Sequence, residues 1–258
     1  MTHNAFDLTG KVALVTGGNT GIGLGMAEAL ARAGAGICIW GTNEARNADA
    51  LDKLRAISPE ALALRCDVGD EQMVDQNMAA TVAHFGRVDA CFANAGLTGS
   101  RETRSFVEMT PEEWRRVMRV NIDGAFHTLR AAARHMIEAK RGGSLVVTSS
   151  IAALSGPPRN EHYAASKGAL VSMIQAIAVE LARHRIRANA ILPGWVETSM
   201  TDDLMHNDRF VDAVLPRVPL RRWGTPEDFG GIAVYFASDA SAYHTGDAVV
   251  IDGGYTKF

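Results

Sequence analysis

Hydrophobic and polar positions follow two patterns that alternate along the chain. Short apolar runs, rich in β-branched residues, are separated by longer stretches with helical periodicity. The runs are nearly continuous, as is typical of strands whose two sheet faces are both covered by helices. Seven runs of this kind lie at residues 11–16, 36–40, 61–68, 88–96, 144–150, 186–192 and 247–254.

The alternation of strands and helices predicts the architecture. It is typical of a doubly wound α/β fold of the Rossmann kind, with a parallel seven-stranded sheet, right-handed crossovers and helices on both faces. Seven strands and six or seven main helices would use nearly the whole chain. No repeat, low-complexity tract or Pro/Gly/Ser linker divides it. We therefore expect a single domain over residues 1–258.

Two helices have readable starts. "TPEEW" offers Thr110 as N-cap, a proline at the first helical position and Glu113 to close a capping box. "TPEDF" repeats the device from Thr225, with Asp228 in place of the glutamate. Both motifs predict where a helix begins.

Composition and charge exclude several classes of protein. The 258 residues suffice to bury a core, and 47% apolar with 21% charged residues is typical of a soluble globule. The net charge of −3 and the absence of any run of five like charges disfavour nucleic-acid binding. No H-x3-H or H-E-x-x-H spacing supports a metal site.

The cysteines and the first residues bear on the compartment. Cys38, Cys66 and Cys91 are odd in number and lie in apolar runs, which is typical of reduced, packed cysteines in a cytosolic protein. The start "MTHNAFDLTGK" has no apolar segment of a secretory signal, and no stretch approaches the length of a membrane span. We expect a cytoplasmic protein without a membrane partner.

A glycine-rich turn follows the first strand. "TGGNTGIG", Thr16 to Gly23, leads into the helical stretch "LGMAEALARAGA". Gly17 permits a tight bend, while Gly21 and Gly23 let phosphates and the neighbouring strand approach the backbone. The helix N-terminus adds free N–H groups and a positive dipole end. A strand before the turn and a helix after it favour a dinucleotide pyrophosphate site over a simple turn.

This glycine spacing and later motifs resemble the short-chain dehydrogenase/reductase family, in its short single-domain branch. The chain is similar to members of the 3-oxoacyl-carrier-protein reductase type over about residues 7 to 258. Each motif alone can occur by chance in an unrelated chain, but all of them together, in the family's order, are highly specific. They are "TGGNTGIG", Asp67-Val68, "NAG" (Asn94 to Gly96), Asn121, "TSS" ending at Ser150, "YAASK" (Tyr163 to Lys167), "PGWVET" (Pro193 to Thr198) and "DGG" (Asp252 to Gly254).

The resemblance implies a catalytic set of four residues. Ser150 would orient the substrate oxygen, and Tyr163 would exchange a proton with it. Lys167 would also bind the nicotinamide ribose, and Asn121 would hold a water that links Lys167 to solvent. Hydride would pass directly between cofactor and substrate carbon, so no metal is needed.

The chemistry of the Tyr-x3-Lys pair can be argued from the residues as well. Tyr163 and Lys167 are four apart and share one face of a helix. A free tyrosine has a pKa of about 10, and a nearby ammonium is expected to lower it and favour a general acid/base. Each residue alone also has an ordinary structural explanation. His162, next to Tyr163, is expected to face solvent.

The resemblance also implies which residues bind the cofactor, an NAD(P) dinucleotide. Asp67 and Val68 would contact the adenine, and Thr198 would contact the cofactor or cap the next helix. The full expected set is Gly17, Asn19, Thr20, Gly21, Ile22, Gly23, Gly41, Thr42, Asp67, Val68, Asn94, Ala95, Gly96, Tyr163, Lys167, Pro193, Gly194, Val196 and Thr198.

Cofactor preference depends on the end of the second strand. The ribose-reading residue is expected about 20 residues beyond the glycine turn, which is Gly41 or Thr42 here. An acid at residue 41 would bind the 2′-hydroxyl, and a base at residue 42 or Thr20 would attract a 2′-phosphate. The chain has neither, and Arg46 is the nearest cation. We favour NAD(H) because no cation is committed to the phosphate, while NADP(H) stays open because no acid repels it.

Substrate and assembly are less legible. Residues 195–219 are expected to form a lid, whose Trp195 and Phe210 suit an apolar ketone or a 3-oxoacyl group. Arg101 and Arg104 are expected to be solvated loop residues, with an anionic substrate as the other possibility. The alternatives are a sugar or polyol dehydrogenase and a silent dinucleotide-binding regulator. An extended-branch epimerase would need another glycine spacing and an extra domain. The resemblance implies a homotetramer, with a homodimer as the alternative.

Overall fold

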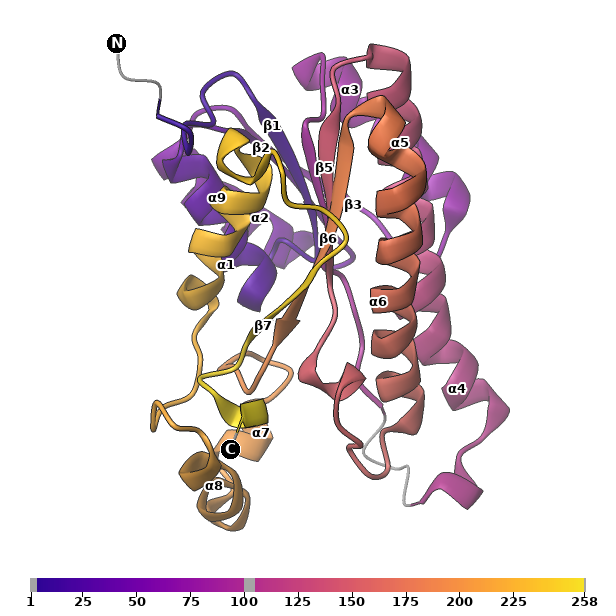
Figure 1. The fold of residues 1–258 in the computed structure, drawn as a ribbon, viewed down its shortest axis with the longest axis vertical. Coiled ribbons are helices and arrows are strands. Elements are labelled where there is room, and N and C mark those ends of the chain that lie inside the picture. The colour runs from indigo at the N-terminus through magenta and orange to yellow at the C-terminus, as the bar shows by residue number, and fades with distance from the viewer. Residues whose placement is uncertain (1–3, 100–104, 258) are drawn as a thin grey trace.

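The computed structural model describes residues 4–99 and 105–257 of the chain. One seven-stranded parallel sheet runs through them, in the order β3-β2-β1-β4-β5-β6-β7, with helices on both faces (Figure 1). The order reverses direction between β1 and β4, which is where an open α/β sheet forms a crevice for ligands. The predicted fold class is confirmed.

Each predicted apolar run overlaps one observed strand, but four runs extend past the carboxyl end of theirs. Val68, Gly96, Ser150 and Gly254 lie outside the strands because the chain leaves the sheet earlier at its carboxyl edge. The strands are β1 (Val12–Thr16), β2 (Gly36–Gly41), β3 (Ala61–Arg65), β4 (Ala90–Ala93), β5 (Gly143–Thr148), β6 (Ile186–Pro193) and β7 (Ala248–Ile251).

The helices form a layer on each face of the sheet, and each layer buries its own apolar core. Phe229 and Phe236 are in one core, whereas Trp40 and Leu129 are in the other. On the first face lie α1 (Gly21–Arg32), α2 (Glu44–Ile57) and α9 (Gly230–Ala237); on the second lie α3 (Glu71–Phe85), α4 (Pro111–Met118), α5 (Gly124–Ala139) and α6 (Glu161–Leu181) (Figure 1).

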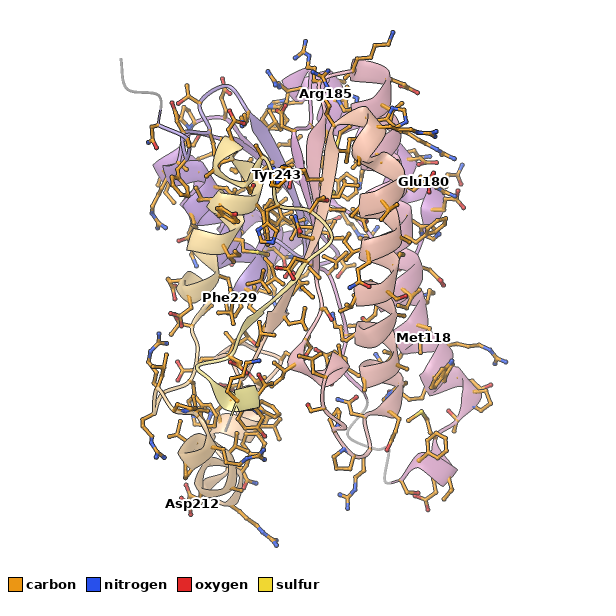
Figure 2. All side chains as sticks on the ribbon, viewed as in Figure 1. Met118, Glu180, Arg185, Asp212, Phe229 and Tyr243 are labelled. Carbon is orange, nitrogen blue, oxygen red and sulfur yellow. The ribbon has the colours of Figure 1, made fainter. Side chains whose placement is uncertain are left out.

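The short helices α7 (Asp202–Met205) and α8 (Asp208–Val214) lie beyond the carboxyl ends of the strands. Figure 2 places Asp212 of α8 at the opposite end of the molecule from Arg185, which directly precedes β6. The segment expected to be a lid therefore sits at the edge of the sheet where ligands of such folds bind.

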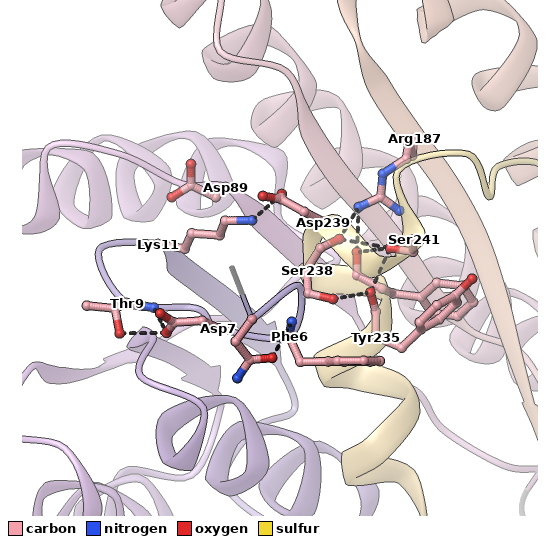
Figure 3. Close-up of polar contacts among 12 residues, drawn as sticks. Phe6, Asp7, Thr9, Lys11, Asp89, Arg187, Tyr235, Ser238, Asp239 and Ser241 are labelled. Atoms are coloured by element: carbon pink, nitrogen blue, oxygen red, sulfur yellow. Dashed lines mark hydrogen bonds and ion pairs between the residues drawn. The ribbon is translucent and has the colours of Figure 1, made fainter. Parts of the chain in front are cut away.

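At the amino edge of the sheet, polar contacts hold the C-terminal segment in place (Figure 3). Lys11 Nζ donates to Asp239 Oδ1 at 2.7 Å, and Arg187 Nη2 donates to the carbonyl of Phe236 at 2.7 Å. The second contact satisfies a carbonyl at the end of α9, where a cation is favourable. These contacts close the amino edge.

Helix α6 differs from one expectation. With the turn that follows it, Glu161–His184 is long and apolar enough to cross a membrane by length and composition alone. The expectation that no stretch approaches that length was therefore wrong. Leu170 and Ile174 of this helix are buried in the core against the sheet. Its apolar character is explained by that packing.

The two predicted helix starts are found at the expected residues. The hydroxyl of Thr110 accepts from the N–H of Glu113 at 3.2 Å, and the capping box between Thr225 and Asp228 is complete. The N-cap of α7 is Thr201, not Thr198. Between α4 and α5 the helix widens to a π-turn, Arg119–Asp123, a feature that sequence periodicity did not reveal and that is frequent at functional sites.

Candidate active site

A cavity of about 420 Å³ opens at the carboxyl edge of the sheet. Every residue predicted to bind the cofactor lines it, as do Ser150, Tyr163 and Lys167. Asn121 lies behind the lining. Three further lining residues, Ser199, Met200 and Thr201, lie in the expected lid. Sequence reasoning missed the lining residues Trp40, Cys66, Leu97, Arg119, Val120, Thr148 and Ser149. Most of these directly adjoin a predicted residue, so the strand ends signal them.

The turn after β1 is shaped for close approach. Gly17 and Gly21 have φ angles of +62° and +52°, which favour glycine. A Cβ on Gly23 would lie 2.3 Å from the carbonyl oxygen of Gly17. Since the glycines carry no side chain and α1 starts at Gly21, the turn presents backbone at these positions close to a helix N-terminus. That is the form a pyrophosphate group requires.

Asn94 joins the strands at the point where their order reverses. Its Nδ2 donates to the carbonyl of Thr16 at 3.1 Å, and its Oδ1 accepts from the hydroxyl of Thr148 at 3.0 Å. The N–H groups of Asn94 and Ala95 both donate to the Thr16 hydroxyl at 3.0 Å. Asn94 therefore fixes the floor of the cavity, and a contact with the cofactor stays a prediction.

Tyr163 and Lys167 project from the first half of α6 toward the end of β5. Lys167 Nζ donates to the carbonyl of Thr148 at 2.8 Å and lies 5.5 Å from the centre of the Tyr163 ring. Tyr163 forms a hydrogen bond with Ser150, and the Ser149 hydroxyl donates to the carbonyl of Lys167 at 2.7 Å. The three predicted catalytic side chains are thus brought together at one end of the cavity.

Burial dominates the titration of this pair. It raises the pKa of Tyr163 above its usual value, and the hydrogen bond from Ser150 only partly opposes the change. It also lowers the pKa of Lys167 to about 8. The expectation of a lowered tyrosine pKa was therefore wrong for this structure, because loss of water outweighs the one opposing contribution, the hydrogen bond with Ser150. Tyr163 holds its proton at neutral pH, as an acid requires.

Asn121 lies in the π-turn and is buried, not exposed. Its Oδ1 accepts from the N–H of Leu97 at 2.7 Å, and its Nδ2 donates to the carbonyl of Leu97 and to the hydroxyl of Ser166, both at 2.9 Å. The side chain thus ties the segment after β4 to α6. The predicted water relay stays a prediction.

Asp67 lines the cavity at the end where the adenine is expected to bind, and it pairs with Arg119, which the sequence did not indicate. Two nitrogens of Arg119 lie 3.0 Å from its Oδ2, while its Oδ1 accepts from the N–H of Gly69 at 2.9 Å. Arg119 lies 52 residues further along the chain and enters through the π-turn, so no local pattern signals it. This pair borders the cavity together with Val68 and Val120.

At the end of β2 the cavity is lined by Gly41 and Thr42. Arg46, the nearest cation in sequence, is exposed on the first turn of α2 and is not among the cavity-lining residues. Arg65, which pairs with Gly41 from β3, does not line the cavity either, and its Nε lies 3.8 Å from Glu44 Oε1.

The first part of the expected lid lines the cavity, while the two aromatic residues named for it pack on each other. The rings of Trp195 and Phe210 meet edge to face at 4.9 Å, and Phe210 stacks on Trp223 at 6.2 Å. Met200 and Leu204 are both exposed, and of the two only Met200 lines the cavity. Arg101 and Arg104 lie outside the described residues.

His162 was expected to face solvent, and that expectation was wrong. Its side chain is fully buried, and its Nε2 lies 3.2 Å from Oε1 of Glu113 on α4. A Cβ on Gly99 would lie 2.4 Å from the imidazole, so the segment after β4 packs on the ring. Helix α4 covers this face of α6, which a single-helix argument did not include.

A family model described as enoyl-(acyl carrier protein) reductase matches residues 17–256. A solved structure titled as a short-chain type dehydrogenase/reductase from Mycobacterium marinum is 37% identical, with a TM-score of 0.92 over 98% of both chains. The chain belongs to the short-chain dehydrogenase/reductase family. The predicted resemblance is confirmed, and the protein is an oxidoreductase of this family.

Relatives within the short-chain dehydrogenase/reductase family bear different names. L-rhamnose 1-dehydrogenase (NAD(P)(+)) of Sphingomonas sp. (strain SKA58) is 36% identical over 96% of both chains. The 3-oxoacyl-[acyl-carrier-protein] reductase of Chlamydia pneumoniae is 35% identical over 96% of this chain and 98% of its own. A gluconate 5-dehydrogenase from Burkholderia cenocepacia J2315, solved with NADP and tartrate, is 33% identical over 98% of both chains, with a TM-score of 0.92.

Proposed function

We propose that this short-chain dehydrogenase/reductase interconverts a secondary alcohol and a ketone with an NAD(P) cofactor. The observation that carries the proposal is the convergence of Ser150, Tyr163 and Lys167 on the same cavity as the glycine turn. The glycine turn would hold the pyrophosphate of a dinucleotide, and these three side chains lie in the same cavity, where they would meet its reactive end. No catalytic residue is missing, which disfavours a silent dinucleotide-binding regulator.

The cofactor supplies or accepts the hydride when bound. Ser150 holds the substrate oxygen by a hydrogen bond, and Tyr163 gives it a proton during reduction or takes one during oxidation. Lys167 binds the ribose beside the nicotinamide, and Asn121 keeps the backbone at Leu97 in place beside them. Among the described residues, no group of three or more His, Cys, Asp or Glu side chains is placed to hold a metal ion.

The test of this function is Tyr163→Phe. We expect turnover on any ketone that the wild type reduces to fall by about 10²- to 10⁴-fold, the contribution of one general acid. Binding of NADH or NADPH, measured by the change in cofactor fluorescence, should persist. Full turnover by the variant would show that Tyr163 is not the acid.

We propose an apolar ketone or a 3-oxoacyl group as the substrate, since Leu97 and Met200 line the cavity together with Ser150. A sugar or sugar acid is the alternative, because Ser199 and Thr201 line it too and relatives are named as dehydrogenases of rhamnose and gluconate. A panel of 3-oxoacyl thioesters, cyclic ketones and aldonic acids separates them. Activity on sugars alone would overturn the apolar proposal.

We propose NAD(H) as the preferred cofactor. Support comes from the exposed position of Arg46 and the neutral strand end at Gly41 and Thr42. The gluconate 5-dehydrogenase solved with NADP is the counterexample within the family. Paired titrations with NADH and NADPH on one ketone give the preference directly. A strong NADPH preference that Arg46→Ala abolishes would reverse this proposal and identify the phosphate ligand.

A cytoplasmic homotetramer, or else a homodimer, is the assembly we propose. Phe126 on α5 is half-exposed and Val179 on α6 is 83% exposed, on the two helices through which the family assembles. The three cysteines are free and buried, in keeping with a reducing compartment. Light scattering at micromolar concentration tests the assembly, and a monomer would contradict it.

A further inference from the structure

The strand end that reads the adenosine ribose has a second layer of polar residues behind it. Given the proposed dinucleotide function, we infer that Asn47 of α2 orients Asn19 of the glycine turn and thereby makes this site prefer a 2′-hydroxyl to a 2′-phosphate. Asn47 is buried, with 5% of its surface exposed, and is absent from the cavity lining. It therefore acts as a positioning residue.

Two backbone carbonyls determine which way the Asn47 amide faces. Its Nδ2 donates to the carbonyl of Gly41 at 2.9 Å and to the carbonyl of Leu64 at 3.3 Å. A carbonyl oxygen only accepts, so the nitrogen side of the amide must face the ends of β2 and β3. Turning the amide over would set its oxygen against both carbonyl oxygens and lose both hydrogen bonds, leaving the carbonyl of Gly41 with the N–H of Cys66 as its donor.

The orientation of Asn47 then determines that of Asn19. Asn47 Oδ1 accepts from Asn19 Nδ2 at 2.7 Å, so Asn19 must present its nitrogen to Asn47. Asn19 lines the cavity, and none of the hydrogen bonds among the described residues uses its Oδ1. The free polar atom that this orientation leaves to a ligand is therefore a carbonyl-type acceptor, with one remaining amide hydrogen.

The amide pair fills the position of a residue-41 side chain. A Cβ on Gly41 would lie 2.3 Å from Asn19 Nδ2 and 2.6 Å from Asn47 Oδ1. The two asparagines thus leave no room for an acidic side chain at residue 41, and Asn19 supplies an acceptor in its place. An acceptor at this point lies where a carboxylate would read the ribose.

An acceptor distinguishes the two cofactors by hydrogen-bond polarity. A ribose 2′-hydroxyl donates to Asn19 Oδ1, whereas a 2′-phosphate carries only acceptor oxygens and negative charge at neutral pH. The second hydrogen of Asn19 Nδ2 serves either ligand and does not discriminate. Of the cations lining the cavity, Arg119 binds Asp67 and Lys167 binds the carbonyl of Thr148.

The test uses binding rather than turnover. Dissociation constants for ADP-ribose and 2′-phospho-ADP-ribose are measured by calorimetry on the wild type, Asn47→Leu and Asn77→Leu. Leucine keeps the size of asparagine and removes its hydrogen bonds. Asn77 is the matched control, because its Nδ2 donates to the carbonyl of Arg65 at the end of β3 and it does not line the cavity.

We expect the wild type to bind ADP-ribose more tightly. The dissociation constant for 2′-phospho-ADP-ribose divided by that for ADP-ribose should fall about fivefold in Asn47→Leu, which is the effect of one ordinary hydrogen bond. The fall should come mainly from weaker binding of ADP-ribose. Asn77→Leu should leave the ratio unchanged. A wild type that prefers the 2′-phosphate ligand, or an unchanged ratio in Asn47→Leu, would overturn the inference.

A double variant tests whether Asn47 acts through Asn19. Asn19→Ala should narrow the ratio as Asn47→Leu does, and the double variant should add nothing further, because Asn47 acts through Asn19. Additive losses would overturn the positioning role. If Asn47→Leu does not fold, Asn47→Ser carries the same comparison. A wild type that binds neither ligand would refute the proposed function itself, an outcome distinct from a wrong ratio.

Discussion

Lys167 Nζ is fixed on the carbonyl of Thr148 at 2.8 Å and lies 5.5 Å from the centre of the Tyr163 ring. The lysine is therefore held beside the tyrosine in a site with little water. Burial lowers its pKa to about 8, while it raises the pKa of Tyr163. The pair combines a protonated tyrosine with a lysine ammonium whose burial lowers the stability of the fold. Such a loss of stability is typical of active sites rather than of structural cores.

Replacing Lys167 should stabilise the fold in a pH-dependent way. The unfolded lysine has a pKa of 10.5 and the folded one about 8. Burial of the charged lysine therefore lowers the free energy of unfolding by its full amount below pH 8, and the effect disappears above pH 10.5. It corresponds to roughly 3 kcal/mol at most. Lys167→Met removes that cost and adds a pH-independent loss, because the carbonyl of Thr148 loses its donor.

Urea unfolding of wild type and Lys167→Met at pH 7 and pH 10.5 measures this. The variant should gain stability relative to the wild type at pH 7, and the advantage should shrink as the pH rises through the window. An equal difference at both pH values would mean that the folded lysine titrates normally.

Gly23 and Gly231 form a matched pair of glycine-to-alanine tests. A Cβ on Gly23 would lie 2.3 Å from the carbonyl oxygen of Gly17 and 2.5 Å from Asn94 Nδ2. Gly23→Ala should therefore cost about 1–3 kcal/mol and weaken dinucleotide binding sharply. Gly231 is exposed on α9 with nothing near its Cβ, so Gly231→Ala should gain up to about 1 kcal/mol. Thermal unfolding and cofactor titration measure both.

His162 and Glu113 connect α6 to α4. Their bond is buried at His162, and Arg116 also binds Glu113 at 2.7 Å. His162→Leu should lower the free energy of unfolding by about 1–3 kcal/mol, since Glu113 loses a buried donor. Affinity for NADH should stay unchanged, because His162 does not line the cavity. Urea unfolding and cofactor titration separate the two, and a weakened NADH affinity would contradict this assignment.

The three thiols should be unreactive in the folded protein. Burial raises the pKa of Cys38 to about 12 and that of Cys66 to about 11, and it raises that of Cys91 as well. The thiolate is the reactive form, so a disulfide reagent such as dithionitrobenzoate should label none of the three at pH 8. Unfolding in guanidinium should release three. Rapid labelling without denaturant would show that the core opens.

Much of the fold and site could be predicted from the sequence because their determinants are local. Seven apolar runs predicted seven strands, and carboxyl ends of parallel strands meet at one edge, which gathers Asp67, Asn94, Ser150 and Pro193 around one cavity. The glycine turn is likewise local, since its φ angles and lack of side chains depend on the residue type. Tyr163 and Lys167 share a face by helical spacing alone.

The tertiary structure decided what depends on neighbours distant in sequence. The π-turn set Arg119 on Asp67, and α4 buried His162. Packing removed water from Tyr163 and so raised its pKa, against a prediction that considered only the nearby charge. Gly41 marked the strand end that was expected to read the ribose, but only the fold placed Asn19 and Asn47 in the space beside it. The burial of a side chain and the direction of its hydrogen bonds depend on contacts between different helices and strands. The periodicity within one helix or strand therefore does not predict them.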